Sequence, residues 1–143
     1  GVQTCALPIC NTEQMAEAVA AGAAASGLKN IVLHNTNYTD ASFILQDVFK
    51  YKGFCVGSPT YMNEMFPSVE AVLQKIERRD VKDRVFAAFG SYTWAGAAVK
   101  RINALVERLG WDNVGSVEEM QGLKDEKYEA CYQLGRQLAE KIK

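Results

Sequence analysis

Histidine is scarce in this sequence, and long apolar runs are missing. His34 is the only histidine among the 143 residues. A single imidazole excludes the multi-histidine metal sites of hydrolases and diiron oxidases from this chain, because those sites need several imidazoles on one ion. The longest uninterrupted apolar runs reach five residues, whereas a membrane-spanning helix needs about 20. We therefore expect a soluble protein that does not span a membrane.

The sequence also lacks an excess of charge and any close pairing of cysteines. Sixteen basic and seventeen acidic residues give a net charge of −1, so nothing favours binding to nucleic acid or to an anionic membrane surface. Cys5, Cys10, Cys55 and Cys131 show no Cys-x-x-Cys spacing and are too few for a disulfide scaffold. A reducing compartment follows, and we predict a cytoplasmic protein that folds as one globular domain.

The first ten residues differ in composition from the rest of the chain. GVQTCALPIC at residues 1–10 carries no charge, so every charged side chain lies after it. Residues 1–9 resemble the translation of a short-read sequencing adapter, and Pro8 argues against a central strand there. We interpret residues 1–10 as a non-native leader and residues 11–143 as the domain.

From residue 11 onward, short apolar runs alternate with helical periods, which is typical of an α/β fold with a mostly parallel sheet. Because a strand normally precedes each helix in such a sheet, the first strand is expected to be missing or replaced. Strands are expected at residues 31–33, 54–56, 85–89 and within 114–123. Helices are expected over residues 12–26, 40–50, 95–109 and 125–141, with a further helix that begins at Pro67.

Apolar spacing predicts which side chains are buried. Phe43, Ile44 and Phe49 are expected to bury the helix at 40–50. His34 has no evident acidic partner and is interpreted as a surface or loop residue, while Cys55 is expected to be an unreactive core thiol. The buried stripe of the last helix is expected to comprise Tyr128, Cys131, Leu134, Leu138 and Ile142.

Three segments are expected to meet at the carboxyl edge of the sheet, where open parallel sheets bind their ligands. Two of them follow buried strands and begin with Gly-Ser: GSPTYMNEMFP at residues 57–67 and GSYTWAGAA at residues 90–98. The third is Asn11-Thr12 at the start of the first helix, where free backbone amides favour an anion.

Together these segments suit a planar ring system with a phosphate tail. Tyr61, Tyr92 and Trp94 offer flat faces, and the Ser and Thr hydroxyls offer neutral hydrogen bonds. No basic residue precedes Lys29, which is compatible with a phosphate held by amides and hydroxyls. The motifs G-x-G-x-x-G and G-x-x-x-x-G-K-[ST] are both missing, so Rossmann cofactors and nucleotide hydrolysis lose their main support.

Three motifs together resemble one known family. NTEQMA at residues 11–16, VGSPTYMNEMFP at 56–67 and AAFGSYTWAGAAVKRI at 87–102 are similar to the flavodoxin-like domain of A-type flavoproteins, also called flavodiiron proteins. The resemblance covers residues 11–143. It implies an α/β, flavodoxin-like three-layer sandwich with a parallel sheet of order 2-1-3-4-5 and one bound FMN.

The resemblance also implies which residues bind FMN. The family's phosphate loop reads roughly Ser/Thr-x-x-x-Asn/Ser-Thr, of which Asn11 and Thr12 remain here, with Leu7 and Cys10 at the other positions. No side chain is expected to be catalytic or to bind a metal. The remaining implied contacts are Ser58, Pro59, Thr60, Tyr61 and Asn63 on one side of the flavin, and Ser91, Tyr92, Trp94 and Gly96 on the other.

The implied function is that of an FMN-binding electron-transfer domain, in which the flavin performs the redox chemistry. Family members usually carry an N-terminal diiron domain that reduces oxygen or nitric oxide. The chain is therefore expected to be a C-terminal fragment of such an oxidoreductase. The implied partners are the diiron domain of the parent protein or of its dimer mate, and a rubredoxin-type or flavin reductase electron donor.

Two other interpretations remain open. A receiver-like signalling domain has the same strand order, but it needs a phosphorylatable Asp in an acidic cluster at a central strand end, where this chain has Gly57-Ser58-Pro59. A non-catalytic module that has kept the fold and lost FMN is compatible with the half-replaced phosphate loop.

Overall fold

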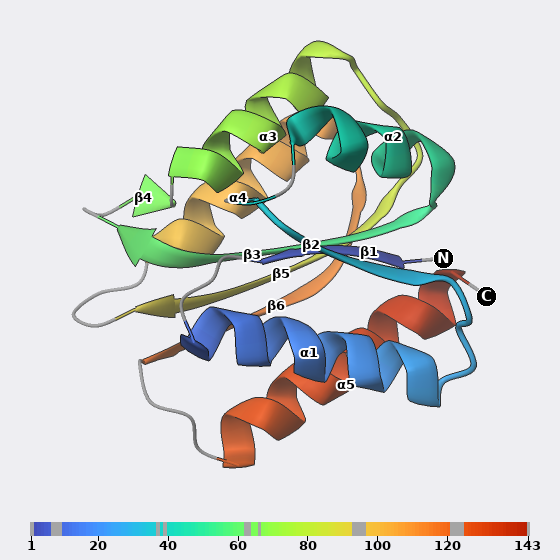
Figure 1. The fold of residues 1–143 in the computed structure, drawn as a ribbon, viewed down its shortest axis with the longest axis vertical. Helices are drawn as coiled ribbons and strands as arrows, with labels where there is room; N and C mark the ends of the chain where they lie inside the picture. Colours follow the sequence, from blue (N-terminus) through green and yellow to red (C-terminus); the bar gives the residue numbers. More distant parts are fainter. Residues whose placement is uncertain are drawn as a thin grey trace.

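A parallel sheet lies between two layers of helices in the computed structural model of the chain (Figure 1). The structure describes residues 2–6, 10–36, 38, 40–61, 64–65, 67–92, 97–120 and 125–142. The elements, in chain order, are β1 (Val2–Ala6), α1 (Cys10–Ala25), β2 (Ile31–Asn35), α2 (Ala41–Lys50), β3 (Gly53–Tyr61), β4 (Glu64–Met65), α3 (Pro67–Arg78), β5 (Val85–Tyr92), α4 (Ala98–Leu109), β6 (Asp112–Met120) and α5 (Asp125–Ile142).

The strand order confirms the expected fold class. The parallel strands lie in the order β2-β1-β3-β5-β6, and the short β4 pairs with β3 in antiparallel fashion. With β4 set aside, this is the predicted order 2-1-3-4-5. The continuous apolar runs predicted as buried strands form β2, β3 and β5, and each strand extends its predicted run at one or both ends. The runs in β3 and β5 are buried as predicted, but the edge strand β2 is only partly buried, with Leu33 49% exposed.

Residues from the segment interpreted as a leader form β1, an interior strand between β2 and β3. Val2 of β1 pairs with Ile31 of β2 on one side and with Gly53 of β3 on the other. A strand is therefore present before α1, and the expectation that it is missing is wrong. Pro8, which argued against a strand in this segment, lies outside the described residues.

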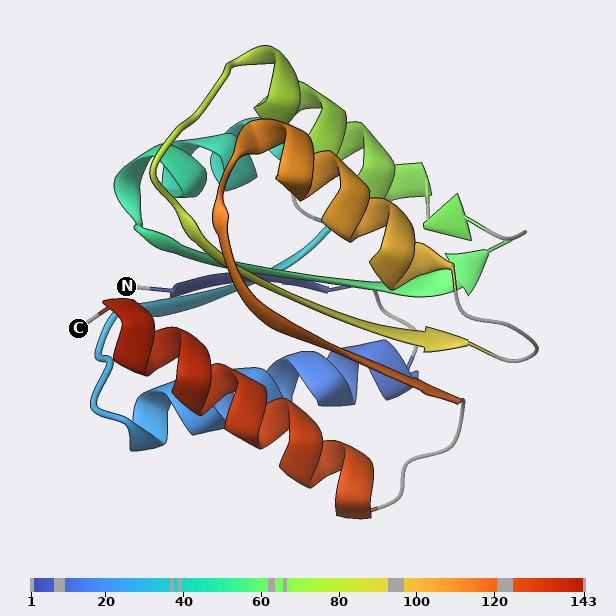
Figure 2. The same ribbon diagram turned by 180° about the vertical axis from the view of Figure 1, so that it is seen from behind.

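Helices α1 and α5 cover one face of the sheet, and two glycines let them approach closely (Figure 2). A Cβ added at Gly22 would lie 1.9 Å from the carbonyl oxygen of Tyr132, and one added at Gly135 would lie 2.0 Å from that of Val19. Backbone therefore packs directly on backbone. The core on this face comprises Met15, Ala16, Ala18, Val19, Cys55, Val85, Ala87, Phe89, Cys131, Leu134 and Leu138.

The predicted stripe of the last helix is correct in its middle and wrong at its start. Cys131, Leu134 and Leu138 are buried, whereas Tyr128 is 42% exposed. Tyr128 stacks instead on Tyr132 of its own helix, with ring centroids 6.5 Å apart. Cys55 is buried in β3, as expected of a core thiol.

An aromatic cluster forms the core of the opposite face, beneath α2, α3 and α4. Phe54 of β3, Phe86 of β5 and Trp111 pack with ring centroids 5.8 to 6.1 Å apart. The buried indole of Trp111 donates its Nε1–H to the carbonyl oxygen of Val81 at 2.7 Å, so that burial leaves no unpaired polar group there.

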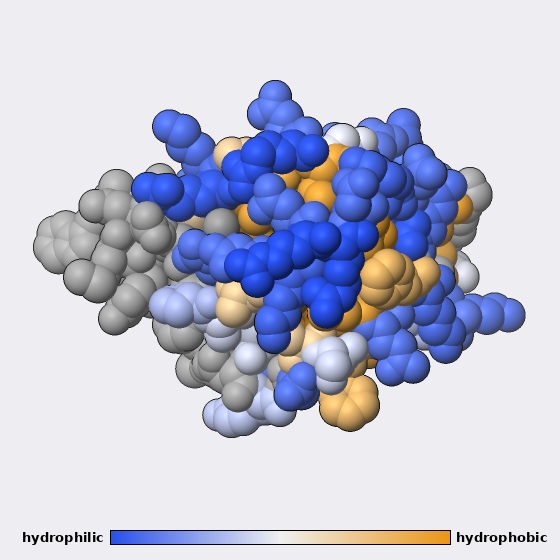
Figure 3. All heavy atoms as spheres, turned by 90° about the horizontal axis from the view of Figure 1, so that it is seen from above, coloured by the Kyte–Doolittle hydropathy of each residue, from blue (hydrophilic) through white to orange (hydrophobic). Residues whose placement is uncertain are grey.

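The helix α2 contacts this core through a different side than its sequence predicted. Phe43 and Phe49 are 61% and 52% exposed, while Ile44, Leu45 and Val48 are buried. At 3.6 residues per turn, Phe43 and Phe49 each lie about 100° or more around the helix from both Ile44 and Val48, whereas the buried Leu45 lies about 60° from Val48. Viewed over this helix layer, polar side chains cover most of the surface, with apolar groups between them (Figure 3).

No described helix is long and apolar enough to cross a lipid bilayer.

Polar contacts tie α2 to the rest of the fold. His34 of β2 lies 2.6 Å from Asp47 of α2, measured from Nε2 to Oδ2, which corrects the interpretation of His34 as a residue without an acidic partner. Thirteen positions separate the two residues, so local sequence gave no sign of the pair. Arg84 donates to the carbonyl oxygens of Val48 and Phe49 at the end of the helix, at 2.8 and 3.1 Å, and so satisfies groups that the last turn leaves free.

Replacement of Gly135 by alanine tests the contact between α1 and α5. The added methyl group would overlap the carbonyl of Val19, so the helices must separate, and overpacking outweighs the gain in helix propensity. We expect Gly135→Ala to lower the free energy of unfolding by about 2 kcal/mol, measured by urea denaturation. Glu140→Ala, at an exposed site of the same helix, is the control and should change little.

Asp40 makes the stability of the domain depend on pH. Its carboxylate accepts hydrogen bonds from the backbone N–H and the hydroxyl of Ser42, which hold the pKa of Asp40 below its ordinary value of 3.8. A lowered pKa stabilises the fold above that value, and the benefit is lost as the pH falls through the folded-state pKa.

Urea denaturation at about pH 7 and about pH 2.5 measures this dependence. We expect Asp40→Ala to be less stable than the wild type at neutral pH and to lose most of that difference at the acidic pH. Asp40→Ser keeps a capping oxygen without an ionisable group, so its stability relative to Asp40→Ala should stay constant. An equal loss for Asp40→Ala at both pH values would contradict this role of the charge.

Candidate functional site

The two Gly-Ser pairs lie side by side on neighbouring strands in the middle of the sheet. Ser58 of β3 is paired with Gly90 of β5, and the next pair along is Pro59 with Ser91. The sequence suggested that each pair follows the end of its strand, but both pairs lie within the strands, because β3 continues to Tyr61 and β5 to Tyr92. The residues that extend furthest at the carboxyl edge are therefore the ones that follow each Gly-Ser pair.

Both glycines make room for protein atoms. A Cβ at Gly57 would lie 1.9 Å from the ring of Phe89. At Gly90, it would lie 2.8 Å from the carbonyl oxygen of Ser58 and equally close to a methyl group of Val99. The two glycines therefore let an aromatic ring and α4 pack against the strands.

The two serines beside these glycines face opposite sides of the sheet. Residues alternate in direction along a strand, so Ser58 lies on the side of Phe54, beneath α3 and α4, and Ser91 lies on the side of Phe89, towards α1 and α5. Both serine side chains are almost fully buried. The site therefore has polar groups within the protein on both faces of the sheet edge.

A short hairpin continues β3 beyond the sheet, and it was missed by the sequence analysis. Thr60 pairs with Met65 and Tyr61 with Glu64. Two residues separate Tyr61 from Glu64, which is the spacing of a tight hairpin, but Met62 and Asn63 are not a typical turn pair, so the sequence gave little sign of it. The hairpin fixes the backbone of Thr60 and Tyr61 at the edge.

The start of α1 lies at the same edge. Asn11 and Thr12 belong to its first turn, where backbone N–H groups have no partner within the helix. Figures 1 and 2 both show the beginning of α1 beside the carboxyl ends of β3 and β5. The third predicted segment therefore joins the other two, as its position in the sequence indicated.

Glu118 of β6 is a further residue of this edge that the sequence analysis did not single out. It pairs with Gly90 in the sheet, and its Oε2 atom accepts a hydrogen bond from the backbone N–H of Val99 at 3.4 Å. Val99 lies in the first turn of α4, whose N-cap is Ala97 and has no capping side chain. The sequence predicted β6 only within residues 114–123, so it did not show which residue of β5 pairs with Glu118.

The structure brings most of the predicted FMN contacts to one edge. The backbone of Asn63, Trp94 and Gly96 lies outside the described residues. The contacts placed at the edge are Asn11, Thr12, Ser58, Pro59, Thr60, Tyr61, Ser91 and Tyr92.

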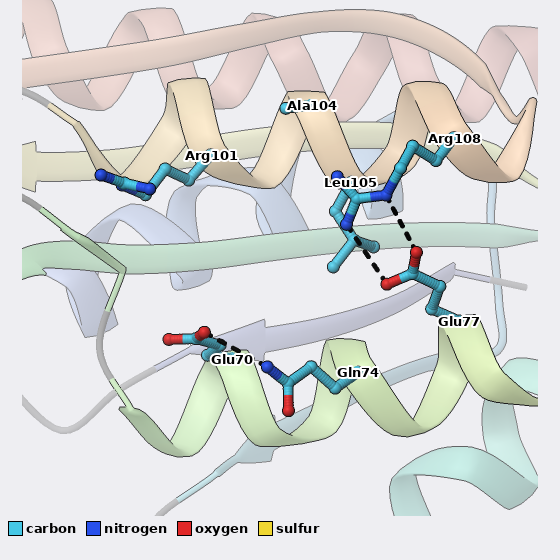
Figure 4. A pocket seen from close by; sticks show the side chains of 7 residues that line it. All are labelled: Glu70, Gln74, Glu77, Arg101, Ala104, Leu105 and Arg108. Atoms are coloured by element: carbon cyan, nitrogen blue, oxygen red, sulfur yellow. Dashed lines mark hydrogen bonds and ion pairs between the residues drawn. The ribbon is translucent and has the colours of Figure 1, made fainter.

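A separate groove of about 230 Å³ lies between α3 and α4 and contains none of the predicted contacts (Figure 4). Arg108 donates two hydrogen bonds to Glu77 across it, at 2.9 and 3.3 Å. This pairing lowers the pKa of the Glu77 carboxyl and raises the pKa of Arg108. Within the described ranges, no three His, Cys, Asp or Glu side chains are placed to share a metal ion.

Solved structures of flavodoxin-like proteins share this fold. Rubredoxin oxygen:oxidoreductase from Desulfovibrio gigas matches 99% of this chain with a TM-score of 0.93 and 24% identity, over 35% of its own length. The flavodiiron protein from Giardia intestinalis matches 99% of this chain with a TM-score of 0.92 and 24% identity, also over 35% of its length. The match to Megasphaera elsdenii flavodoxin covers 98% of this chain and 99% of that protein, with a TM-score of 0.81 and 24% identity.

Curated relatives are similar over most of this chain. The anaerobic nitric oxide reductase flavorubredoxin of Vibrio vulnificus is 34% identical over 130 residues, which are 90% of this chain and 26% of that protein. Its Escherichia coli (strain SMS-3-5 / SECEC) counterpart is 30% identical over 130 residues, or 90% and 27%. The chain thus spans about a quarter of the length of these relatives.

The model of the flavodoxin family matches residues 9–135 of the sequence. This match spans most of the chain and includes all three segments that meet at the carboxyl edge. On this match and on the observed strand order, the chain belongs to the flavodoxin family.

Proposed function

We propose that this chain binds FMN at the carboxyl edge of its sheet and serves as an electron-transfer domain. The observation that carries the proposal is the meeting of three segments at one edge of a flavodoxin-family fold: the first turn of α1, Ser58 to Tyr61 on β3, and Ser91-Tyr92 on β5. Open parallel sheets bind ligands at this edge. When bound, FMN supplies the chemistry of accepting and passing on electrons.

The groups at the edge fit such a ligand. A phosphate needs donors of hydrogen bonds, and the first turn of α1 offers backbone N–H groups together with the positive end of the helix dipole. The hydroxyl-bearing residues Ser58, Thr60 and Ser91 are neutral, so they supply polar contacts without a fixed charge. The donor set therefore suits an anion at one end and an uncharged polar ring at the other.

The neighbouring helices support the assignment of the phosphate to α1. Asp40 caps α2, and Glu118 accepts from the first turn of α4. An anion at either of these helix starts would meet a carboxylate. We infer that the phosphate lies against Asn11 and Thr12, and that α2 and α4 do not take part in holding it.

The ring contacts follow from the strands that border the edge. We propose that Pro59, Thr60, Tyr61 and Asn63 frame one side of the flavin after Ser58. On the other side, Tyr92, Trp94 and Gly96 follow Ser91. The aromatic residues of this set stack on the ring and shield it from water, since aromatic faces pair favourably in offset stacks.

The relatives indicate a larger context for the domain. Its solved neighbours include flavodiiron proteins, of which the matched part is about a third. We propose that the natural protein is an oxidoreductase in which a diiron domain, of the same chain or of a dimer mate, receives electrons from this domain. A rubredoxin-type protein or a flavin reductase supplies them, in the cytoplasm.

We further propose that residues 1–10 are a non-native leader in place of the original first strand and phosphate loop. The uncharged composition of this segment supports the idea, as does the presence of Leu7 and Cys10 at positions where the family carries a hydroxyl and a small residue. On this view β1 keeps the sheet intact, while the phosphate contact is weakened.

Titration of FMN into the purified chain tests the proposed function. We expect binding that quenches flavin fluorescence, and we expect Trp94→Ala to weaken it about tenfold, because aromatic stacking contributes about 0.5 to 1.5 kcal/mol. Phe49→Ala, which removes an exposed aromatic side chain at the far end of α2, is the matched control and should bind like the wild type.

A variant with an altered segment 1–10 tests whether weak FMN binding comes from the damaged phosphate loop or from a fold that no longer binds FMN. It carries a β-branched strand at residues 1–6, and the substitutions Leu7→Ser and Cys10→Gly complete the family's loop with the existing Asn11 and Thr12. We expect it to bind FMN more tightly than the original. If both chains fold, as judged by circular dichroism, and neither quenches FMN, the proposed function is wrong and the interpretation as a module without ligand is favoured.

A further inference from the structure

Helix α4 begins in an unusual way for a helix at the ligand edge. Its N-cap residue, Ala97, has no side chain that can accept a hydrogen bond. The first amides of a helix lack partners within it and are normally satisfied by a Ser, Thr, Asp or Asn at the N-cap. In α4 the acceptor comes instead from another element, because Glu118 of β6 receives the N–H of Val99 at 3.4 Å.

The sheet register explains how Glu118 reaches this position. Glu118 pairs with Gly90, and a Cβ at Gly90 would lie 3.9 Å from its Oε2 atom and 2.8 Å from Val99. The missing side chain at Gly90 thus leaves room for α4 to pack on β5 with its first turn within reach of the carboxylate. Strand β6, strand β5 and α4 therefore contact one another through Glu118, Gly90 and Val99.

This point lies next to the candidate site. Ser58, Gly90 and Ser91 are neighbours in the ladder, and the carbonyl oxygen of Ser58 lies as close to the Gly90 position as Val99 does. The chain leaves β5 at Tyr92 and enters α4 at Ala98. The position of the first turn of α4 therefore determines where the chain re-enters the fold after the edge.

We propose that Glu118 is a positioning residue of the FMN site: its carboxylate caps α4 from the neighbouring strand and fixes the first turn of that helix against Gly90. The inference rests on the proposed function for its effect on FMN, and on the structure alone for the cap. Because the carboxylate also places a negative charge at the start of α4, it disfavours binding of the phosphate there and leaves α1 as the place for it.

Two substitutions separate the hydrogen bond from the charge. Glu118→Gln keeps an oxygen that accepts from Val99, and Glu118→Ala removes it. Glu107→Ala, which deletes an exposed carboxylate from the same helix α4, is the matched control. Amide hydrogen exchange at Val99 in the FMN-free protein measures the cap, and an FMN titration with visible circular dichroism of the bound flavin measures the site.

We expect Glu118→Ala to speed exchange at Val99 about five-fold and to weaken FMN binding by about the same factor, which is the effect of a lost helix cap. The flavin circular dichroism should change as well. Glu118→Gln should restore most of the protection and affinity, and Glu107→Ala should match the wild type in all three measurements.

The outcomes that contradict the proposal are distinct from a failure of FMN binding. Unchanged exchange in Glu118→Ala would refute the cap, and equal damage in Glu118→Gln and Glu118→Ala would refute a role as hydrogen-bond acceptor. Faster exchange with unchanged FMN affinity would limit Glu118 to stability and overturn its role in the site. A wild type that does not bind FMN contradicts the proposed function, while the exchange data still decide the cap.

Discussion

The parallel ladder between β3 and β5 is the constraint on which the rest of the structure depends. Parallel strands align their carboxyl ends, so pairing Ser58 with Gly90 forces the two Gly-Ser segments to the same edge. Each strand must also be covered on both faces, and the helices that cover it begin at that edge. The location of the candidate site and the layered architecture are thus two results of one pairing.

Much of the fold was predictable because its signals are local. The run at Val85–Phe89 is continuous, which indicates a strand buried on both faces, and Pro67 marks a helix start by its fixed backbone angle. The run at Ile31–Leu33 has the same pattern and does form a strand, but it lies at the sheet edge with Leu33 half exposed. The position of Val2–Ala6 was not predictable in this way. Its place between β2 and β3 depends on strands that come later in the chain, and composition alone argued against it.

Several of the errors share a physical cause, since they concern a partner distant in sequence. Phe43 and Phe49 are as apolar as Ile44, and only the docking of α2 decides which side is buried. His34 gained Asp47 from a helix whose orientation local pattern does not give. In the candidate site, residue types predicted the Ser and Thr positions, but the contact of Glu118 with α4 required the register of β6, which no motif specifies.

The direct packing of α1 on α5 gives the last helix an influence on the far end of the molecule. At Gly22 and Gly135 the two backbones touch, so there is no layer of flexible side chains between them to absorb a displacement. Any movement of α5 is passed to α1 as a rigid body. The geometry of the first turn of α1, where an anion would be held, is in this sense set by residues more than a hundred positions later in the sequence.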